Sequence, residues 1–140
     1  MKYELLPSPI PFSFEGSTYN LFKIKALETF GDVSEGQTGG MVESTNNLSQ
    51  FGCCWVYDNA KVFGGARVYG NAKISNNAVV AGNAQVYDCA KVGGNAVIKG
   101  NTQVYDCARV YDNAKVSGKA KIRGLLRVYG ENKVNNDNWE

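Results

Sequence analysis

The chain repeats itself in steps of six residues, and this period constrains its fold more than any other feature. The phrase QVYDCA occupies residues 85–90 and returns at 103–108, eighteen residues later. A fixed short period of this kind is typical of solenoid architectures. From Trp55 onward the chain divides without a gap into fourteen hexads, which read WVYDNA, KVFGGA, RVYGNA, KISNNA, VVAGNA, QVYDCA, KVGGNA, VIKGNT, QVYDCA, RVYDNA, KVSGKA, KIRGLL, RVYGEN and KVNNDN.

Each position of the hexad has its own chemistry. The second residue, from Val56 to Val134, is always Val or Ile, which are β-branched and favour strands. The fourth and fifth residues are mostly Gly, Asp or Asn, which tolerate left-handed backbone and form turns. The sixth residue is Ala in ten hexads, which indicates that only a small side chain fits there. The hexad therefore predicts a short strand followed by a corner.

Strands this short cannot bury a core alone, but coils stacked on one another bury a continuous aliphatic column. Three hexads per triangular coil give eighteen residues, so the two QVYDCA phrases would lie one above the other. We predict an all-β chain with a triangular parallel β-solenoid of four to five coils over residues 55–138. Residues 1–54 are predicted to form a small N-terminal β cap, with a strand over residues 19–27.

The pleat of a strand predicts which side chains are exposed. Lys61 and Phe63 are expected to point to solvent, because they flank the inward-facing Val62. At the other end of the chain the small sixth position is replaced by larger residues, so we expect the last coil to fray or to fold over as a weak lid. These larger residues are Leu126, Asn132 and Asn138.

The phrase VYGNAK at residues 68–73 resembles the hexapeptide repeat of left-handed parallel β-helices. The resemblance covers residues 55–138, and it alone implies the left-handed winding. With Tyr after Val and GN or DN at the corners, the repeat is most similar to YdcK-type β-solenoids and to hexapeptide-repeat proteins of phages and prophages. This resemblance implies a phage or prophage origin and a homo-oligomer, with a trimer favoured.

Many proteins of the hexapeptide-repeat kind are acyltransferases with a histidine base, and others hold zinc through three histidines. This chain contains no histidine. We therefore predict no catalytic residue, no metal ligands and no cofactor, and we regard the chain as non-enzymatic. Asp88 and Asp106 could stack as paired carboxylates for acid–base work, but aspartates at corners more often accept backbone hydrogen bonds. An acyltransferase-like enzyme that works without histidine is an alternative.

Charge is divided unevenly along the chain. Residues 55–138 contain twelve Lys or Arg and six Asp or Glu, whereas residues 1–54 contain three basic and six acidic residues. Such asymmetry can mark an anionic partner, although a solvated surface with a counter-charged cap explains it as well.

Stacking at eighteen residues predicts columns of like side chains on the outer faces. One face would combine basic residues, which repel each other at the spacing of strands, with aromatic residues. This combination suits an anionic small ligand such as a nucleotide. The predicted ligand-binding residues are Trp55, Tyr57, Lys73, Lys91, Arg109, Tyr111, Arg127 and Tyr129.

A second face would carry a column of tyrosines, and aromatic residues are enriched in subunit interfaces. The predicted interface residues are Tyr69, Tyr87, Tyr105 and Arg123. The function that we favour at this stage is a non-enzymatic scaffold or protein-interaction module, with the anionic-ligand binder and the acyltransferase-like enzyme as alternatives.

The apolar run in the N-terminal segment MKYELLPSPIPF is too short for a signal peptide, and prolines interrupt this run. No stretch reaches the roughly 18 apolar residues of a membrane span. We therefore expect a cytoplasmic protein without a membrane partner.

The chain contains four cysteines and no C-x-x-C motif. We expect free thiols that are buried or half-buried. Cys89 and Cys107 should stack at corresponding corners within the range of a disulfide, but a thiol ladder is favoured because the cytoplasm is reducing.

Overall fold

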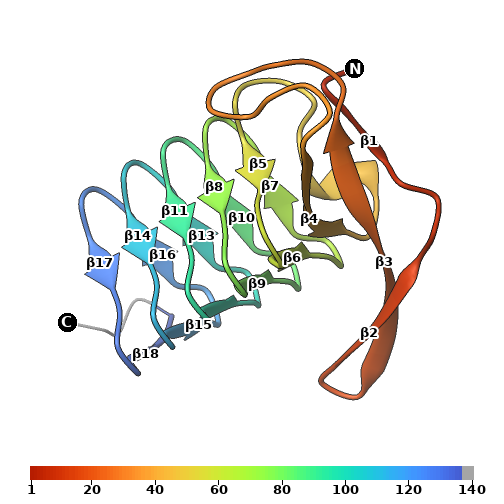
Figure 1. Ribbon diagram of the computed structural model, residues 1–140. Helices are drawn as coiled ribbons and strands as arrows, with labels where there is room; N and C mark the ends of the chain where they lie inside the picture. The colour runs from red at the N-terminus through yellow and green to blue at the C-terminus, as the bar shows by residue number, and fades with distance from the viewer. Residues whose placement is uncertain (137–140) are drawn as a thin grey trace.

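The computed structural model describes residues 1–136, and it confirms the predicted triangular β-solenoid (Figure 1). Val86 pairs in parallel with Val68 on one side and with Val104 on the other, so consecutive coils are eighteen residues apart. The coils wind left-handed from the N-terminal end to the C-terminal end (Figure 1). Residues 1–136 contain one short 3-10 helix, η1 (Thr45–Asn47). No helix in these residues is long and apolar enough to cross a membrane.

Each of the three sides of the prism is a parallel sheet, and we name each one by what it carries. The basic face is formed by β5 (Trp55–Val56), β8 (Lys73–Ile74), β11 (Lys91–Val92), β14 (Arg109–Val110) and β17 (Arg127–Val128). The tyrosine face is formed by β7 (Arg67–Val68), β10 (Gln85–Val86), β13 (Gln103–Val104) and β16 (Lys121–Ile122).

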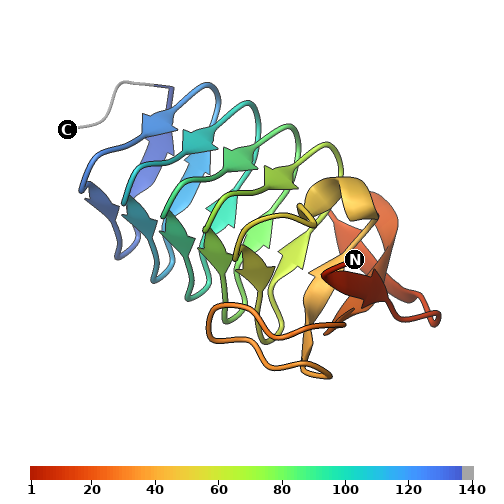
Figure 2. The same cartoon turned by 90° about the horizontal axis from the view of Figure 1, so that it is seen from above.

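The third side, the hairpin face, continues into the N-terminal elements as one sheet. Its solenoid strands are β6 (Lys61–Val62), β9 (Val79–Val80), β12 (Val97–Ile98), β15 (Lys115–Ser117) and β18 (Lys133–Asn135). Its N-terminal strands are β1 (Tyr3–Leu5), β2 (Ile10–Phe14), β3 (Ser17–Ala26) and β4 (Thr38–Val42). Figure 2 shows these N-terminal strands gathered at one end of the stack.

The core of the prism is the aliphatic column that the hexads predict. Every Val or Ile at the second position is buried, with at most 3% of its surface exposed, and every Ala at the sixth position is fully buried. The column does not begin at Trp55. Val42 in β4 pairs in parallel with Val62, and Leu48 bridges to Val68, so the segment before the first hexad already forms part of a coil.

The corners explain why the fourth position of the hexad holds only Gly, Asp or Asn. In all fourteen hexads this residue has a left-handed backbone, with φ between 56° and 72°, which these residue types tolerate best. The Asp side chains also link the coils. Asp88 accepts a hydrogen bond from the N–H of Asp106 at 3.1 Å, and Asp106 accepts one from Gly124 at 2.9 Å. Both carboxylates thus accept backbone hydrogen bonds at corners, as the sequence favours for aspartates in this position.

The prediction that Phe63 points to solvent is wrong. Its ring is fully buried, because the β2–β3 hairpin folds over the outer side of the hairpin face. The rings of Phe12, Phe14 and Tyr19 surround that of Phe63, with centroids at 5.7, 5.4 and 4.5 Å. The predicted strand over residues 19–27 corresponds to β3, which supplies one of these rings.

As far as residue 136, the last coil keeps the shape of the solenoid and does not fold back as a lid. Strands β16, β17 and β18 all pair in register with the coil before them. Leu125 and Leu126 are exposed at the corner between β16 and β17, where the hexad departs from its small sixth residue. Asn138 lies outside the described residues.

At the opposite end, polar side chains bind the backbone groups that no preceding coil can reach. The Asn47 side chain is buried and fully bonded. Its Oδ1 accepts from the N–H groups of Glu43 and Ser44, and its Nδ2 donates to the carbonyls of Gly64 and Ala66 at 3.1 and 2.8 Å.

Lys2 does the same at a second corner. Its buried Nζ donates to the carbonyl of Cys54 at 2.9 Å and lies 4.7 Å from the centroid of the Phe30 ring. These bonds close an edge that would otherwise be open to end-to-end association.

We predict that Asn47→Ala lowers the free energy of unfolding by about 1–3 kcal/mol, because it leaves buried donors and acceptors without partners. Urea denaturation followed by circular dichroism measures this change. Asn46→Ala is the matched control, since Asn46 is exposed in the same helical turn. Equal midpoints for the two variants would contradict the role that we assign to Asn47.

Candidate functional site: a groove on the basic face

The predicted column of basic residues is present on the basic face, where its residues pair in register from coil to coil. Lys91, Arg109 and Arg127 are exposed. The pairs along the column are Trp55 with Lys73, Lys73 with Lys91, Lys91 with Arg109, and Arg109 with Arg127. The eighteen-residue repeat therefore places five predicted site residues in one line.

Trp55 lies in this line but is not available to a ligand, which corrects its predicted role. Its side chain is fully buried, because β1 and the loop between β3 and β4 cover it. The Tyr3 and Phe30 rings pack against the Trp55 ring with centroids at 6.1 and 5.3 Å. The indole N–H has no hydrogen-bond partner among residues 1–136. Trp55 thus serves the packing of the cap.

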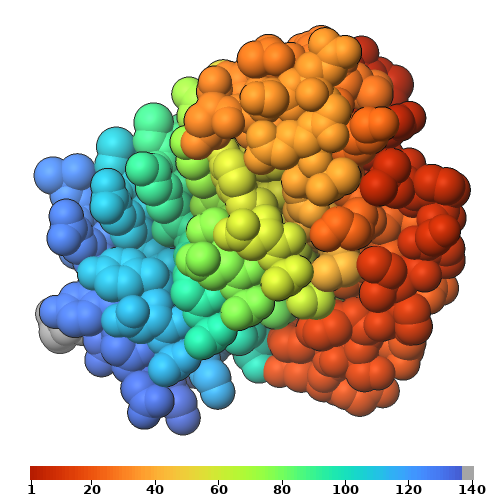
Figure 3. All heavy atoms as spheres, viewed as in Figure 1, coloured from red at the N-terminus to blue at the C-terminus, as the bar shows by residue number. Residues whose placement is uncertain are grey.

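The same loop places a carboxylate on the next member of the column. Asp32 forms an ion pair with Lys73 at 3.3 Å and accepts a hydrogen bond from the Tyr57 hydroxyl at 2.6 Å. The bond from Tyr57, helped by the Lys73 charge, holds the pKa of the Asp32 carboxyl below its usual value. Burial, and then the bond to Asp32, raise the pKa of Tyr57. Figure 3 shows the loop, in orange, over the N-terminal part of the molecule.

Beyond this loop the three remaining basic residues of the column differ from Lys73. Within residues 1–136, no carboxylate forms an ion pair with Lys91, Arg109 or Arg127. Positive side chains at the spacing of neighbouring strands repel each other. An anion placed between them would relieve this repulsion.

The aromatic residues beside this column are interrupted. Tyr111 and Tyr129 stack with ring centroids 5.6 Å apart, but Ser75 and Gly93 occupy the equivalent positions between Tyr57 and Tyr111. Gly93 has no side chain, so the ring of Tyr111 has no neighbouring ring on that side.

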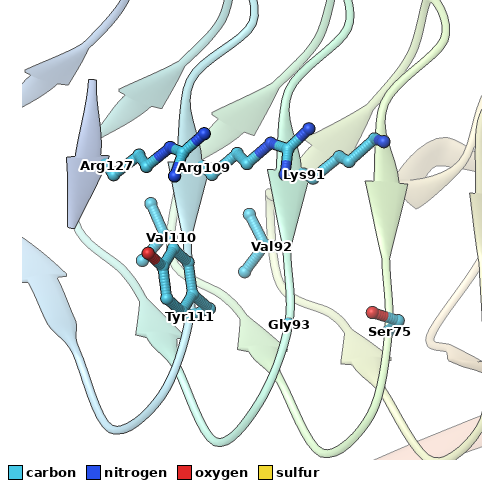
Figure 4. A pocket seen from close by; sticks show the side chains of 8 residues that line it. All are labelled: Ser75, Lys91, Val92, Gly93, Arg109, Val110, Tyr111 and Arg127. Atoms are coloured by element: carbon cyan, nitrogen blue, oxygen red, sulfur yellow. The ribbon is translucent and has the colours of Figure 1, made fainter. Parts of the chain in front are cut away.

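The interruption leaves a shallow hollow of about 270 Å³ (Figure 4). Figure 4 shows the basic side chains along one side of this hollow, with the Tyr111 ring and the bare backbone of Gly93 beside them. We call this hollow the basic groove. Its lining residues are Ser75, Lys91, Val92, Gly93, Arg109, Val110, Tyr111 and Arg127.

The predicted interface residues form a second column on the tyrosine face. The Tyr69 and Tyr87 rings are stacked at 4.8 Å, and those of Tyr87 and Tyr105 at 5.1 Å. The hydroxyls of Tyr69 and Tyr87 donate to Gln85 and Gln103 on the following coils. Arg123 takes the next place in this column.

The cysteines are free thiols, but two of them are more exposed than predicted. Cys54 is buried and Cys53 is half-buried, whereas Cys89 and Cys107 are exposed. The last two occupy the fifth position of a hexad, which lies on the outside of a corner. In the described part of the chain no group of three or more Cys, Asp or Glu side chains is placed to hold a metal ion.

Comparison with known proteins supports the relationship suggested by the repeat. No protein-family profile matches the chain. A protein of Escherichia coli (strain K12) named "uncharacterized acetyltransferase YdcK" is 37% identical over 83 residues, which cover 56% of this chain and 26% of that protein. The chain is a hexapeptide-repeat β-solenoid. It spans about a quarter of the length of the relative that it matches.

The repeat predicted the positions of the basic column, but not which of its members a ligand could reach. Asp32 lies in a loop without any periodicity, so no signal in the sequence connects it to Lys73. The gap at Gly93 had a signal, because alignment of the coils at eighteen residues places Ser75 and Gly93 between two tyrosines.

Proposed function

We propose that this chain is a binding module whose basic groove takes a ligand with an anionic group and a planar ring, such as a nucleotide. The observation that carries this proposal is a set of three basic side chains, which pair with no carboxylate of residues 1–136, next to an open face of Tyr111. The proposal assigns no catalytic step to the chain.

The protein itself contains an example of the expected anion binding. Asp32 lies between the ammonium group of Lys73 and the hydroxyl of Tyr57. Further along the same face Lys91 and Arg109 offer cations one and two coils beyond Lys73, and Tyr111 offers a hydroxyl three coils beyond Tyr57. An external phosphate or carboxylate would therefore meet the chemistry that already binds Asp32.

A ring on the ligand would gain from the gap at Gly93. One face of Tyr111 is stacked on Tyr129, and the other is turned toward a position without a side chain. Stacking of a base on an aromatic side chain contributes about 1–3 kcal/mol. The groove thus favours an anion that carries a ring over one that does not.

We predict that adenosine monophosphate binds the intact chain about tenfold more tightly than ribose 5-phosphate, because only the former can stack on Tyr111. Isothermal titration calorimetry measures both affinities. Arg109→Ala is expected to lower the affinity for both ligands about tenfold, since it removes a charge-assisted contact. Tyr111→Leu is expected to remove the preference for the ring.

Lys115→Ala is the control for general charge, because Lys115 is exposed on the hairpin face. Binding should also weaken as salt is raised, since exposed charges are screened. Failure of both ligands to bind at low salt would exclude the proposed function. An effect of Lys115→Ala equal to that of Arg109→Ala would show non-specific attraction instead.

Acetyl transfer is a second candidate function, and the name of the Escherichia coli relative is what favours it. Coenzyme A carries an adenine nucleotide, so an acetyl-coenzyme A donor would present a ring and phosphates to the same groove. The chain has no histidine to act as a base. We expect no release of free coenzyme A from acetyl-coenzyme A in the presence of amine acceptors. Turnover that is lost in Arg109→Ala would replace the binding module with an enzyme.

We also propose that the chain forms a homo-oligomer through the tyrosine face, with a trimer as the expected state. The flat stack of Tyr69, Tyr87 and Tyr105 supports this, because aromatic surface is common in interfaces. Light scattering should give a single oligomer for the intact chain and a smaller species for Tyr87→Ser. A monomer unaffected by the substitution would contradict the proposal.

A further inference from the structure

The column of tyrosines on the tyrosine face is one ring short at its N-terminal end. Tyr69, Tyr87 and Tyr105 stack almost in parallel, with interplanar angles of 1° and 4°. The position before Tyr69 belongs to Ser49, because the N–H of Ser49 donates to the carbonyl of Val68 and Leu48 bridges to Val68. A small hydroxyl therefore occupies the place in which a ring would continue the stack.

The missing ring leaves a hollow of about 410 Å³ between this end of the column and the η1 turn. One face of Tyr69 is stacked on Tyr87, and the Tyr69 hydroxyl is held by Gln85 on the next coil at 2.9 Å. The other face of the ring is turned toward the hollow. We call it the Ser49 gap, and its lining residues are Thr45, Asn46, Ser49, Arg67, Val68, Tyr69 and Gln85.

The polar groups of the Ser49 gap are ready to accept a ligand. Arg67 is exposed on the same strand face as Tyr69, and within residues 1–136 it pairs with no carboxylate. The side chains of Thr45 and Asn46 have no hydrogen-bond partner in that part of the chain either. The gap thus combines one cation, neutral donors and one open aromatic face.

We propose that the Ser49 gap binds a small aromatic carboxylate. The ligand ring would stack on Tyr69 as a fourth member of the column, and its carboxylate would take the paired N–H groups of Arg67, a geometry that guanidinium and carboxylate share. A monoanion fits because the gap offers a single cation, unlike the three cations of the basic groove. The site lies on a different sheet and does not depend on the function proposed for that groove.

Benzoate and cyclohexanecarboxylate test this site, because they share a carboxylate but only benzoate has an aromatic face. The measurement is an amide NMR titration of the full chain with each acid. Benzoate should shift the amide signals of Ser49, Arg67 and Tyr69. It should bind about two- to tenfold more tightly than cyclohexanecarboxylate, as expected for one aromatic pair.

Two variants should weaken benzoate binding for different reasons. Ser49→Tyr fills the gap with a fourth ring, and Arg67→Gln removes the cation. Each substitution is expected to lower the affinity for benzoate about tenfold or more. Ser49→Ala keeps the gap open and should bind as the intact chain does. Lys115→Gln, on the hairpin face, should also leave the benzoate shifts of Ser49, Arg67 and Tyr69 unchanged. The amide spectra of all variants report whether the fold is retained.

Equal affinity for the two acids would overturn the stacking on Tyr69. Benzoate binding that survives in Ser49→Tyr or Arg67→Gln, or shifts confined to the basic face, would overturn the site itself. Tyr69 also belongs to the proposed oligomer interface, so benzoate and a partner subunit would compete for it. Saturating benzoate should therefore shift the light scattering toward the smaller species. An oligomer that stays intact while benzoate shifts no amide signal would refute the site.

Discussion

The hydrogen bonds between neighbouring coils are the interaction on which the rest of this structure depends. The first residue of each hexad from Trp55 to Lys115 donates its N–H to the coil that follows, as Lys91 does to the carbonyl of Ala108 at 3.0 Å. This ladder keeps every coil in the same register, and the buried Val and Ile residues lock the register from inside. Because one slipped residue would turn the aliphatic side chains outward, the register is strongly specified.

A fixed register has a direct consequence for the surface. Residues of one type accumulate in columns, such as the stacked tyrosines or the line from Lys73 to Arg127. Within a complete column the side chains satisfy or repel one another, and there is little space for a ligand. Space arises where a column is interrupted by a small residue, at Gly93 on one face and at Ser49 on another. Both candidate sites lie at such interruptions, next to a tyrosine with one open face.

The N-terminal segment shapes these surfaces as much as the repeats do. It closes the first coil with Asn47 and Lys2, covers Trp55 and Phe63, and neutralises Lys73 with Asp32. The uneven distribution of charge along the chain thus has a structural cause in part, because one acidic residue of the cap pairs with the basic face. The remaining basic residues of that face, from Lys91 onward, stay uncovered.

The sequence by itself determined the parts of the protein that follow from the period of six: the coil of eighteen residues, the inward Val and Ile, the left-handed corners and the composition of each column. These parts were predictable because repeats contact each other at one fixed offset. Only the tertiary structure decided which column members are accessible, since Trp55, Phe63 and Lys73 are covered by residues from a hairpin and a loop that have no period. Contacts between a repeat and a non-repeating segment have no constant spacing along the chain, so no pattern in the sequence encodes them.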